Sequence, residues 1–227
     1  MKSNNSVINF FRKTAYLWIV LILALIIIFP EIRYQYATVR SDALFHFNRF
    51  YDTAMQIKHH NFQYYISMYG FTRSARMVNL VYSPFFAYLN GLLLLIVGSF
   101  LNYEVMSWLI LALIAAATMH YALKTIHVKE PYITVISALY PVTFQVTSWA
   151  VGLNFTGWGA AFMPLCVGVA LRMLENKQKP VSVLLLAISM SLIIQVHLMT
   201  ALQVIFIYFV FAAIAFYQVT RARLKTI

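Results

Sequence analysis

Apolar runs long enough to cross a membrane alternate with short polar breaks along most of the chain. They cover residues 14–30, 83–101, 104–123, 132–150, 155–174, 181–196 and 198–217. About 20 apolar residues in a helix cross the hydrocarbon core of a bilayer. The mean hydropathy is +0.76, and charged residues make up only 10% of the chain, which leaves too little polar surface for a soluble globule. We therefore predict an all-α fold, a polytopic transmembrane helical bundle that forms one membrane domain over residues 1–227.

The positive charge of the chain lies between the apolar runs. The formal net charge is +11, but nucleic-acid binding needs a basic face or an aromatic–basic module, and the sequence has neither. Short clusters such as Lys124 and Lys129 instead follow the pattern by which basic residues mark cytoplasmic loops. We expect the bilayer as a partner and no nucleic acid.

The same basic residues decide how many runs cross. If every run crossed, 3 of the 17 lysines and arginines would be cytoplasmic, against 11 if residues 83–101 enter the membrane only partly. Pro84 cannot donate a backbone hydrogen bond, and Asn90 and Gly91 interrupt the same run. We predict spans at 14–30, 104–123, 132–150, 155–174, 181–196 and 198–217, a partly inserted helix at 83–101, and both termini cytoplasmic in the cell membrane. A seven-span topology remains an alternative, because the charge rule is a bias.

The outer loop of this topology, residues 30–76, carries most of the polar chemistry. Its stretch SDALFHFNRFYD begins an amphipathic helix, with Ser41 placed as the N-cap. On a helical wheel the polar residues gather on one side, and such a helix is typical of a membrane interface. The polar side consists of Asp42, His46, Arg49, Asp52, Thr53 and Gln56.

Asp42, His46 and Arg49 are spaced by four and three residues, so their side chains share one stripe of the helix. One interpretation is a solvated face with an exposed ion pair, worth only a few tenths of a kcal/mol. The other is a carboxylate at the membrane surface that acts as a general base, beside a histidine and an arginine.

This part of the sequence resembles a known family. The stretch SDALFHFNRFYDTAMQIKHHNFQYYISMYGF followed by NLVYSP is similar to bacterial integral membrane proteins of the 6-pyruvoyl-tetrahydropterin synthase-related group. More broadly, one span, an outer loop that opens with an aspartate, and a proline-led half-helix resemble the GT-C superfamily of membrane glycosyltransferases. The resemblance implies a GT-C-like fold and transfer of a sugar from a polyprenyl-phosphate carrier at the outer face of the membrane.

The resemblance and the residue chemistry together name the candidate site. Asp42 and His46 are the candidate catalytic residues, because the family uses an early aspartate as base or metal ligand. Guanidinium groups grip phosphates, which makes Arg49, Arg73 and Arg76 candidates for substrate binding, although the latter two also suit anionic lipid headgroups. Tyr82 matches the family's tyrosine–proline step. His197 interrupts a long apolar stretch on the side of Asp42 and is added to the substrate-binding set.

Two departures from the family shape the other expectations. Its members are usually longer, so we expect a truncated or split member and a possible membrane protein partner that completes the bundle. The outer carboxylates, Glu31, Asp42, Asp52 and Glu104, are few for a divalent cation, and His59 and His60 are poorly spaced to form a cluster with His46. We assign no metal ligands, although a divalent cation stays possible as a cofactor.

Other function classes remain open. A non-catalytic membrane protein would be an assembly partner or remnant, or a subunit of a transporter or flippase. Ion-coupled transporters need ionisable residues inside their spans, and only Glu104 and His120 lie near one.

Overall fold

The computed structural model describes residues 13–40, 42–151, 156–175 and 180–224. Those residues are helical or irregular and contain no strand. The helices are α2 (Ala15–Tyr34), α3 (Ala43–Lys58), η1 (Phe71–Arg73), α4 (Val78–Val81), α5 (Pro84–Val97), α6 (Phe100–Thr125), α7 (Tyr132–Leu139), η2 (Tyr140–Val142), α8 (Phe144–Ala150), α9 (Thr156–Glu175), α10 (Pro180–Val196) and α11 (Leu198–Leu224). The all-α prediction is confirmed for this part of the chain.

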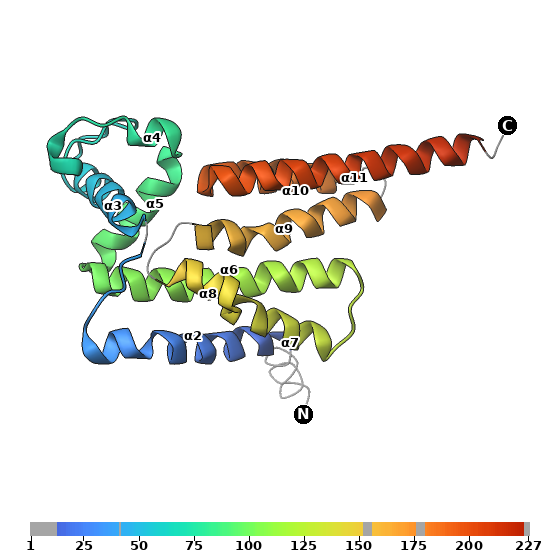
Figure 1. Cartoon of the computed structure of the whole chain (residues 1–227), viewed down its shortest axis with the longest axis horizontal. Coiled ribbons are helices and arrows are strands. Elements are labelled where there is room, and N and C mark those ends of the chain that lie inside the picture. The colour runs from blue at the N-terminus through green and yellow to red at the C-terminus, as the bar shows by residue number, and fades with distance from the viewer. Residues whose placement is uncertain (1–12, 41, 152–155, 176–179, 225–227) are drawn as a thin grey trace, which may run out of the picture.

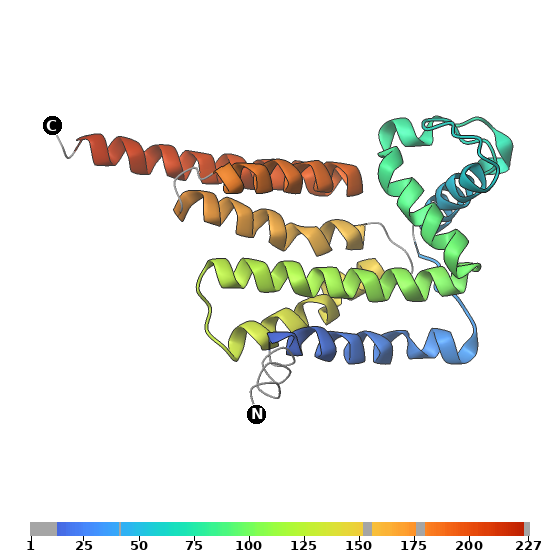
Figure 2. The same cartoon turned by 180° about the vertical axis from the view of Figure 1, so that it is seen from behind.

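The long helices lie side by side in the order α2, α6, α9, and then α10 with α11 (Figures 1 and 2). Side-chain hydrogen bonds support this order: Trp108 of α6 donates to the carbonyl of Ala24 in α2 at 2.9 Å, and Thr118 of α6 donates to that of Ala161 in α9 at 2.6 Å. The main core fills the space between α2, α3, α5 and α6. We call the end of the bundle where α2 stops and α6 and α11 begin the α3 end, because α3 and α5 lie there (Figure 1).

Among the described residues, four helices are long and apolar enough to cross a bilayer: α2, α6, α9 and α11. This fits a membrane protein and agrees with four of the predicted spans. The 17-residue α10 and the 14-residue α5 are apolar but shorter, and at 1.5 Å per residue α5 extends only about 21 Å. The non-crossing role of residues 83–101 and the membrane topology stay predictions. The first residues of α2 and the last of α11 do lie at the same end of the bundle (Figure 1).

The span predicted over 132–150 is not a single helix in the structure. The segment consists of α7, the 3-10 turn η2 and α8. Pro141 lies inside the turn and has no N–H to continue a helical ladder. Thr143 then adopts an extended conformation with φ −61° and ψ 147°, which separates α8 from the turn.

The boundaries of the first outer loop also differ from those predicted. Helix α2 continues through Pro30 to Tyr34 before Gln35 ends it in the left-handed conformation, so the non-helical connection starts five residues later than residue 30. At the start of α3, Asp42 occupies the N-cap position, and its side chain makes no capping hydrogen bond. The predicted N-cap, Ser41, lies outside the described residues.

Candidate functional site

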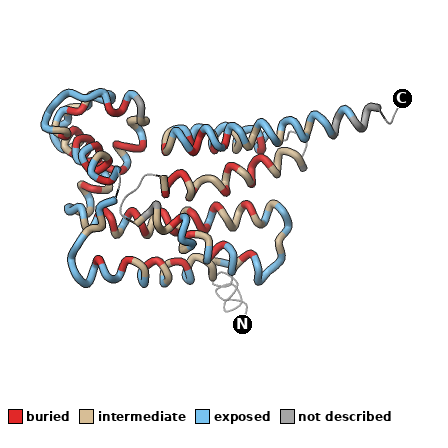
Figure 3. The backbone as a smooth tube through the Cα atoms, in the orientation of Figure 1, coloured by how far each residue is buried: buried red, intermediate tan, exposed pale blue. Residues whose placement is uncertain are grey.

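Helix α3 is buried along most of the polar side of its helical wheel. The side chains of His46, Arg49, Asp52 and Gln56 are all at most 3% exposed, whereas Leu44 is 63% exposed. Figure 3 shows α3 largely buried beneath the exposed loop that follows it. A solvated face is therefore excluded for His46 and Arg49, whereas Asp42 is exposed. Buried polar groups need hydrogen-bond partners, and the loop over 59–83 together with α5 supplies them.

A close helix crossing fixes α3 against α5. The hydroxyl of Thr53 donates to the carbonyl oxygen of Ala87 at 2.8 Å. Gly91 lies on the same contact, where a β-carbon would come within 2.7 Å of the backbone nitrogen of Ala54. Only glycine permits this approach, and it brings the amino-terminal half of α5 beside the polar stripe of α3.

Arg49 ties α3 to the segment that leads into α5. Its Nε donates to Oδ1 of Asn79 at 2.7 Å, and its Nη2 donates to the carbonyl oxygen of Ser83 at 2.5 Å. The guanidinium carbon lies 5.2 Å from the ring centroid of Tyr82, in cation–π geometry. Burial lowers the pKa of Arg49 to about 10, so the side chain stays charged at neutral pH. Two donor groups of Arg49, Nε and Nη2, are thus already hydrogen-bonded to other residues of the protein.

Asp52 organises the loop from the other end of α3. Its Oδ1 accepts the backbone N–H groups of Met68, Tyr69 and Gly70 at 2.7, 2.6 and 3.0 Å. Its Oδ2 accepts Nε2 of Gln56 at 2.7 Å. Gln56 continues the network, since its Oε1 accepts the backbone N–H of Gln63 at 2.8 Å and the hydroxyl of Tyr88.

Neither Asp52 nor Gln56 was a predicted site residue. Both belong to the polar stripe of the wheel that included Asp42 and His46, so the pattern contained a signal for them. The pattern did not reveal their partners, because these include backbone amides of a loop whose sequence has no periodicity.

His46 lies at the centre of the residues that were predicted as a site. Its ring centroid is 5.6 Å from that of Tyr82, and the two rings are nearly perpendicular. The pKa of His46 is lowered to about 3, chiefly because burial disfavours the charged form, with the charges of Arg49 and His197 acting in the same direction. His46 is therefore a neutral imidazole at physiological pH, enclosed behind the surface.

His197, which lies between α10 and α11, belongs to the same cluster. It is the N-cap of α11, where its Nδ1 accepts the backbone N–H of Thr200 at 3.3 Å and contacts the Thr200 hydroxyl at 2.8 Å. Burial lowers the pKa of His197, and the carboxylate of Asp42 opposes that shift. With Nδ1 accepting, a neutral His197 carries its proton on Nε2. Asp42, which is exposed, thus lies close enough to His197 for electrostatic coupling.

The structure brings together five of the seven predicted residues: Asp42, His46, Arg49, Tyr82 and His197. Arg73 and Arg76 are exposed on the loop after α3. Arg76 lies 5.5 Å from the ring centroid of Phe71, and no described contact joins either arginine to the cluster. Groups of three or more potential metal ligands are absent from the described residues.

An apolar cavity of about 300 Å³ adjoins this cluster. Helices α5, α6, α9 and α10 line it, with Phe85 and Phe86 next to the Arg49-bound segment and Gln195 and Val196 next to His197. Asn90 is its other polar lining residue, and Tyr103 already donates to the Asn90 side-chain oxygen at 2.5 Å. His197, which is coupled electrostatically to the exposed Asp42, thus directly follows a residue that lines an apolar space.

No family model, no curated protein and no solved structure matches the chain.

Proposed function

We propose that the chain is a GT-C-like membrane glycosyltransferase, or a truncated member of that group, which transfers a sugar from a polyprenyl-phosphate carrier. The observation that carries the proposal is an apolar cavity whose lining residue Val196 directly precedes His197, together with the electrostatic coupling of His197 to Asp42. A lipid-linked donor needs both features together: an apolar space for its chain and polar groups at the mouth for its head.

In the proposed reaction, Asp42 accepts the proton of the acceptor hydroxyl while the acceptor oxygen bonds to the anomeric carbon. The bond from that carbon to the phosphate oxygen breaks, and polyprenyl phosphate leaves with the electron pair. His197, protonated on Nε2, donates a hydrogen bond to the phosphate. His46 and Arg49 are buried, so they act as positioning residues that support Tyr82 and the start of α5.

The direct test is turnover by the purified full chain with a radiolabelled polyprenyl-phosphate sugar. Asp42→Asn keeps the size of the side chain but removes the base, and we expect it to abolish transfer. Glu130→Gln is the matched control, because Glu130 is an exposed carboxylate outside the cluster. Equal turnover by Asp42→Asn and the parent would show that Asp42 is not the base.

A non-catalytic role is the second candidate, and one observation favours it. Arg49 is the arginine of the cluster, and two of its donor groups bind Asn79 and Ser83. A lipid-binding assembly partner or a subunit of a transporter or flippase needs no further cation there. Binding of the labelled carrier without transfer, lost in a cavity variant such as Phe86→Trp, is the result that would support this second function.

A further inference from the structure

The segment between α3 and α6 carries exposed positive charge and contains no carboxylate of its own. Between Asp52 and Glu104 the sequence contains no acidic residue, and those two flanking carboxylates are only 2% and 0% exposed. Lys58, Arg73 and Arg76 lie between these two residues and are exposed. A surface of this kind attracts anions.

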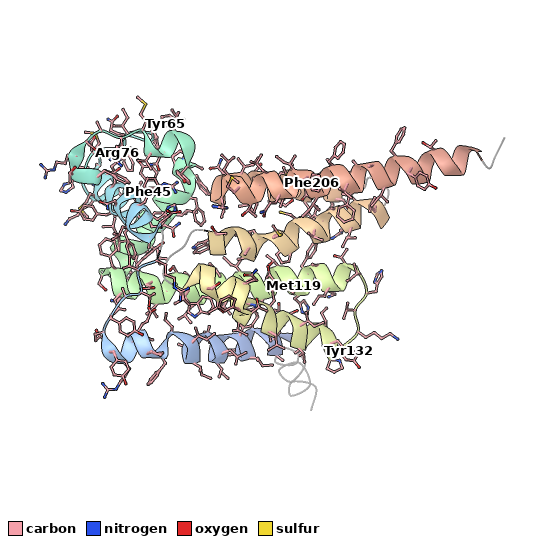
Figure 4. The ribbon with its side chains drawn as sticks, in the orientation of Figure 1. Phe45, Tyr65, Arg76, Met119, Tyr132 and Phe206 are labelled. Carbon is pink, nitrogen blue, oxygen red and sulfur yellow. The ribbon has the colours of Figure 1, made fainter. Side chains whose placement is uncertain are left out.

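Aromatic side chains share that surface. Phe62, Tyr64 and Tyr65 are 44%, 57% and 54% exposed. The ring centroids of Phe62 and Tyr64 lie 6.0 and 5.7 Å from that of Tyr88 in α5, and the Tyr88 hydroxyl is bound to buried Gln56. The exposed rings therefore belong to a fixed cluster. Figure 4 places Tyr65 and Arg76 together at the α3 end, with Tyr132 at the opposite end.

The aromatic cluster lies at one end of an apolar stripe on α5. Phe85, Leu89, Leu92 and Ile96 are spaced by four, three and four residues, so they follow one face of the helix. Their side chains are 56%, 47%, 46% and 72% exposed. A helix face of this composition suits acyl chains, whereas tyrosine rings and arginines suit the headgroup region that lies above them.

The loop that carries both arginines has a defined conformation. Phe71, Thr72 and Arg73 have φ of 49°, 56° and 59°, a left-handed conformation that is costly for residues with a side chain. The three amides bound by Asp52 directly precede this turn. The backbone of Ser67 donates to the carbonyl of Arg76 at 2.9 Å, which closes the loop on itself. These bonds hold Arg73 and Arg76 on one preformed turn.

We propose that the loop over 59–77 and the exposed face of α5 form a single lipid-docking surface, which binds an anionic glycerophospholipid leaflet at the α3 end of the bundle. Arg73 and Arg76 bind lipid phosphates, the Phe62–Tyr64–Tyr65 rings lie at the level of the glycerol groups, and the α5 stripe contacts acyl chains. The proposal does not depend on the proposed glycosyl transfer. It gives a role in lipid binding to Arg73 and Arg76, the two arginines that lie apart from the Asp42 cluster.

The test measures immersion of the loop in nanodiscs of defined lipid. The full chain carries a spin label at Tyr65→Cys in a Cys166→Ala background and is reconstituted in phosphatidylcholine, with and without phosphatidylglycerol. Collision rates with oxygen and with a water-soluble nickel chelate report the depth of the label. We expect the label to be protected from the chelate, and phosphatidylglycerol to increase that protection. A label at Tyr36→Cys, in the exposed connection after α2, should stay accessible in both lipids.

Two charge variants complete the experiment. Arg73→Gln with Arg76→Gln should abolish the increase in protection caused by phosphatidylglycerol, because both side chains that bind phosphate are gone. Arg33→Gln removes an exposed arginine at the α3 end outside the proposed surface and should leave the increase intact. The proposal is overturned if the label at residue 65 is as accessible as that at residue 36, which would indicate a surface for a protein partner. It is equally overturned if the double variant keeps the phosphatidylglycerol effect.

Discussion

One carboxylate oxygen of Asp52 accepts the backbone N–H of Tyr69 at 2.6 Å, and so joins α3 to a loop 17 residues further along the chain. The same oxygen accepts the neighbouring amides of Met68 and Gly70. A charged acceptor that serves three amides inside the protein is a strong local constraint.

Replacing Asp52 with alanine should destabilise the protein, because the amides of Met68, Tyr69 and Gly70 lose their acceptor. Hydrogen bonds to charged groups contribute about 1.5–3 kcal/mol each, so we expect a loss of at least about 3 kcal/mol in the free energy of unfolding. Thermal unfolding in mild detergent measures it. Asp42→Ala is the comparison, since that exposed side chain makes no capping hydrogen bond; it should cost less than about 1 kcal/mol. Equal effects of the two changes would contradict the role given to Asp52.

Arg49 and Asn79 should show energetic coupling. Arg49→Lys removes the Nε donor, and Asn79→Ala removes the acceptor that lies 2.7 Å from it. Each single change should destabilise the protein, and the double variant should cost less than the two losses combined, with a coupling of about 1–3 kcal/mol. A double-mutant cycle on the free energy of unfolding measures this. Additive losses would show that the pair contributes nothing specific.

Gly91 should tolerate no side chain. The β-carbon of Gly91→Ala would lie 2.7 Å from the backbone nitrogen of Ala54, so α5 has to move away from α3, at a cost of about 1–3 kcal/mol. Gly98→Ala separates crowding from backbone effects, because Gly98 has φ +77° and nothing within 4 Å of an added β-carbon. It should cost only about 1 kcal/mol through its left-handed conformation. The separation of the two helices can be measured with a pair of cysteines, one on α3 and one on α5, by the rate at which they form a disulfide. We expect this rate to fall in Gly91→Ala and to stay unchanged in Gly98→Ala.

The stability of the protein should fall as the pH drops below about 6.5. The pKa of His46 is about 3 in the folded protein and about 6.5 in an unfolded chain. Between these values the unfolded state binds the extra proton, so stability rises with pH across this window and is fully present above it. His46→Phe should flatten the dependence between pH 6.5 and 4, as seen in unfolding temperatures. His60→Gln, on the exposed surface, should leave it as in the parent.

The hydrophobic pattern predicts the bundle well, and for physical reasons. Long apolar runs have few alternatives to helices, and α2, α6, α9 and α10 begin and end within about four residues of the runs that predict them. The break at Pro141 follows from the same pattern of reasoning, because proline interrupts a helical ladder.

Only part of the candidate site can be predicted from the sequence. The stripe of Asp42, His46 and Arg49 follows from helix periodicity. Its burial does not, because it depends on Asn79 and on loop amides that show no pattern. The proximity of His197 to Asp42 depends on how α10 and α11 fold back against the α3 end, which is a tertiary property. Whether these groups act on a lipid-linked sugar stays a proposal.

The two-residue link between α5 and α6 gives the cavity wall a pivot. Gly98 and Ser99 alone separate the two helices, and Ser99 caps α6 by accepting the backbone N–H of Asn102 at 3.1 Å. Helix α5 is about 21 Å long, so a rotation of about 10° at this pivot displaces its far end by about 4 Å. At that end, just before the first residue of α5, Arg49 donates a hydrogen bond to the carbonyl oxygen of Ser83. The buried Arg49 guanidinium, together with the hydrogen bond from Thr53 to Ala87, therefore opposes such a rotation and holds the cavity wall in place.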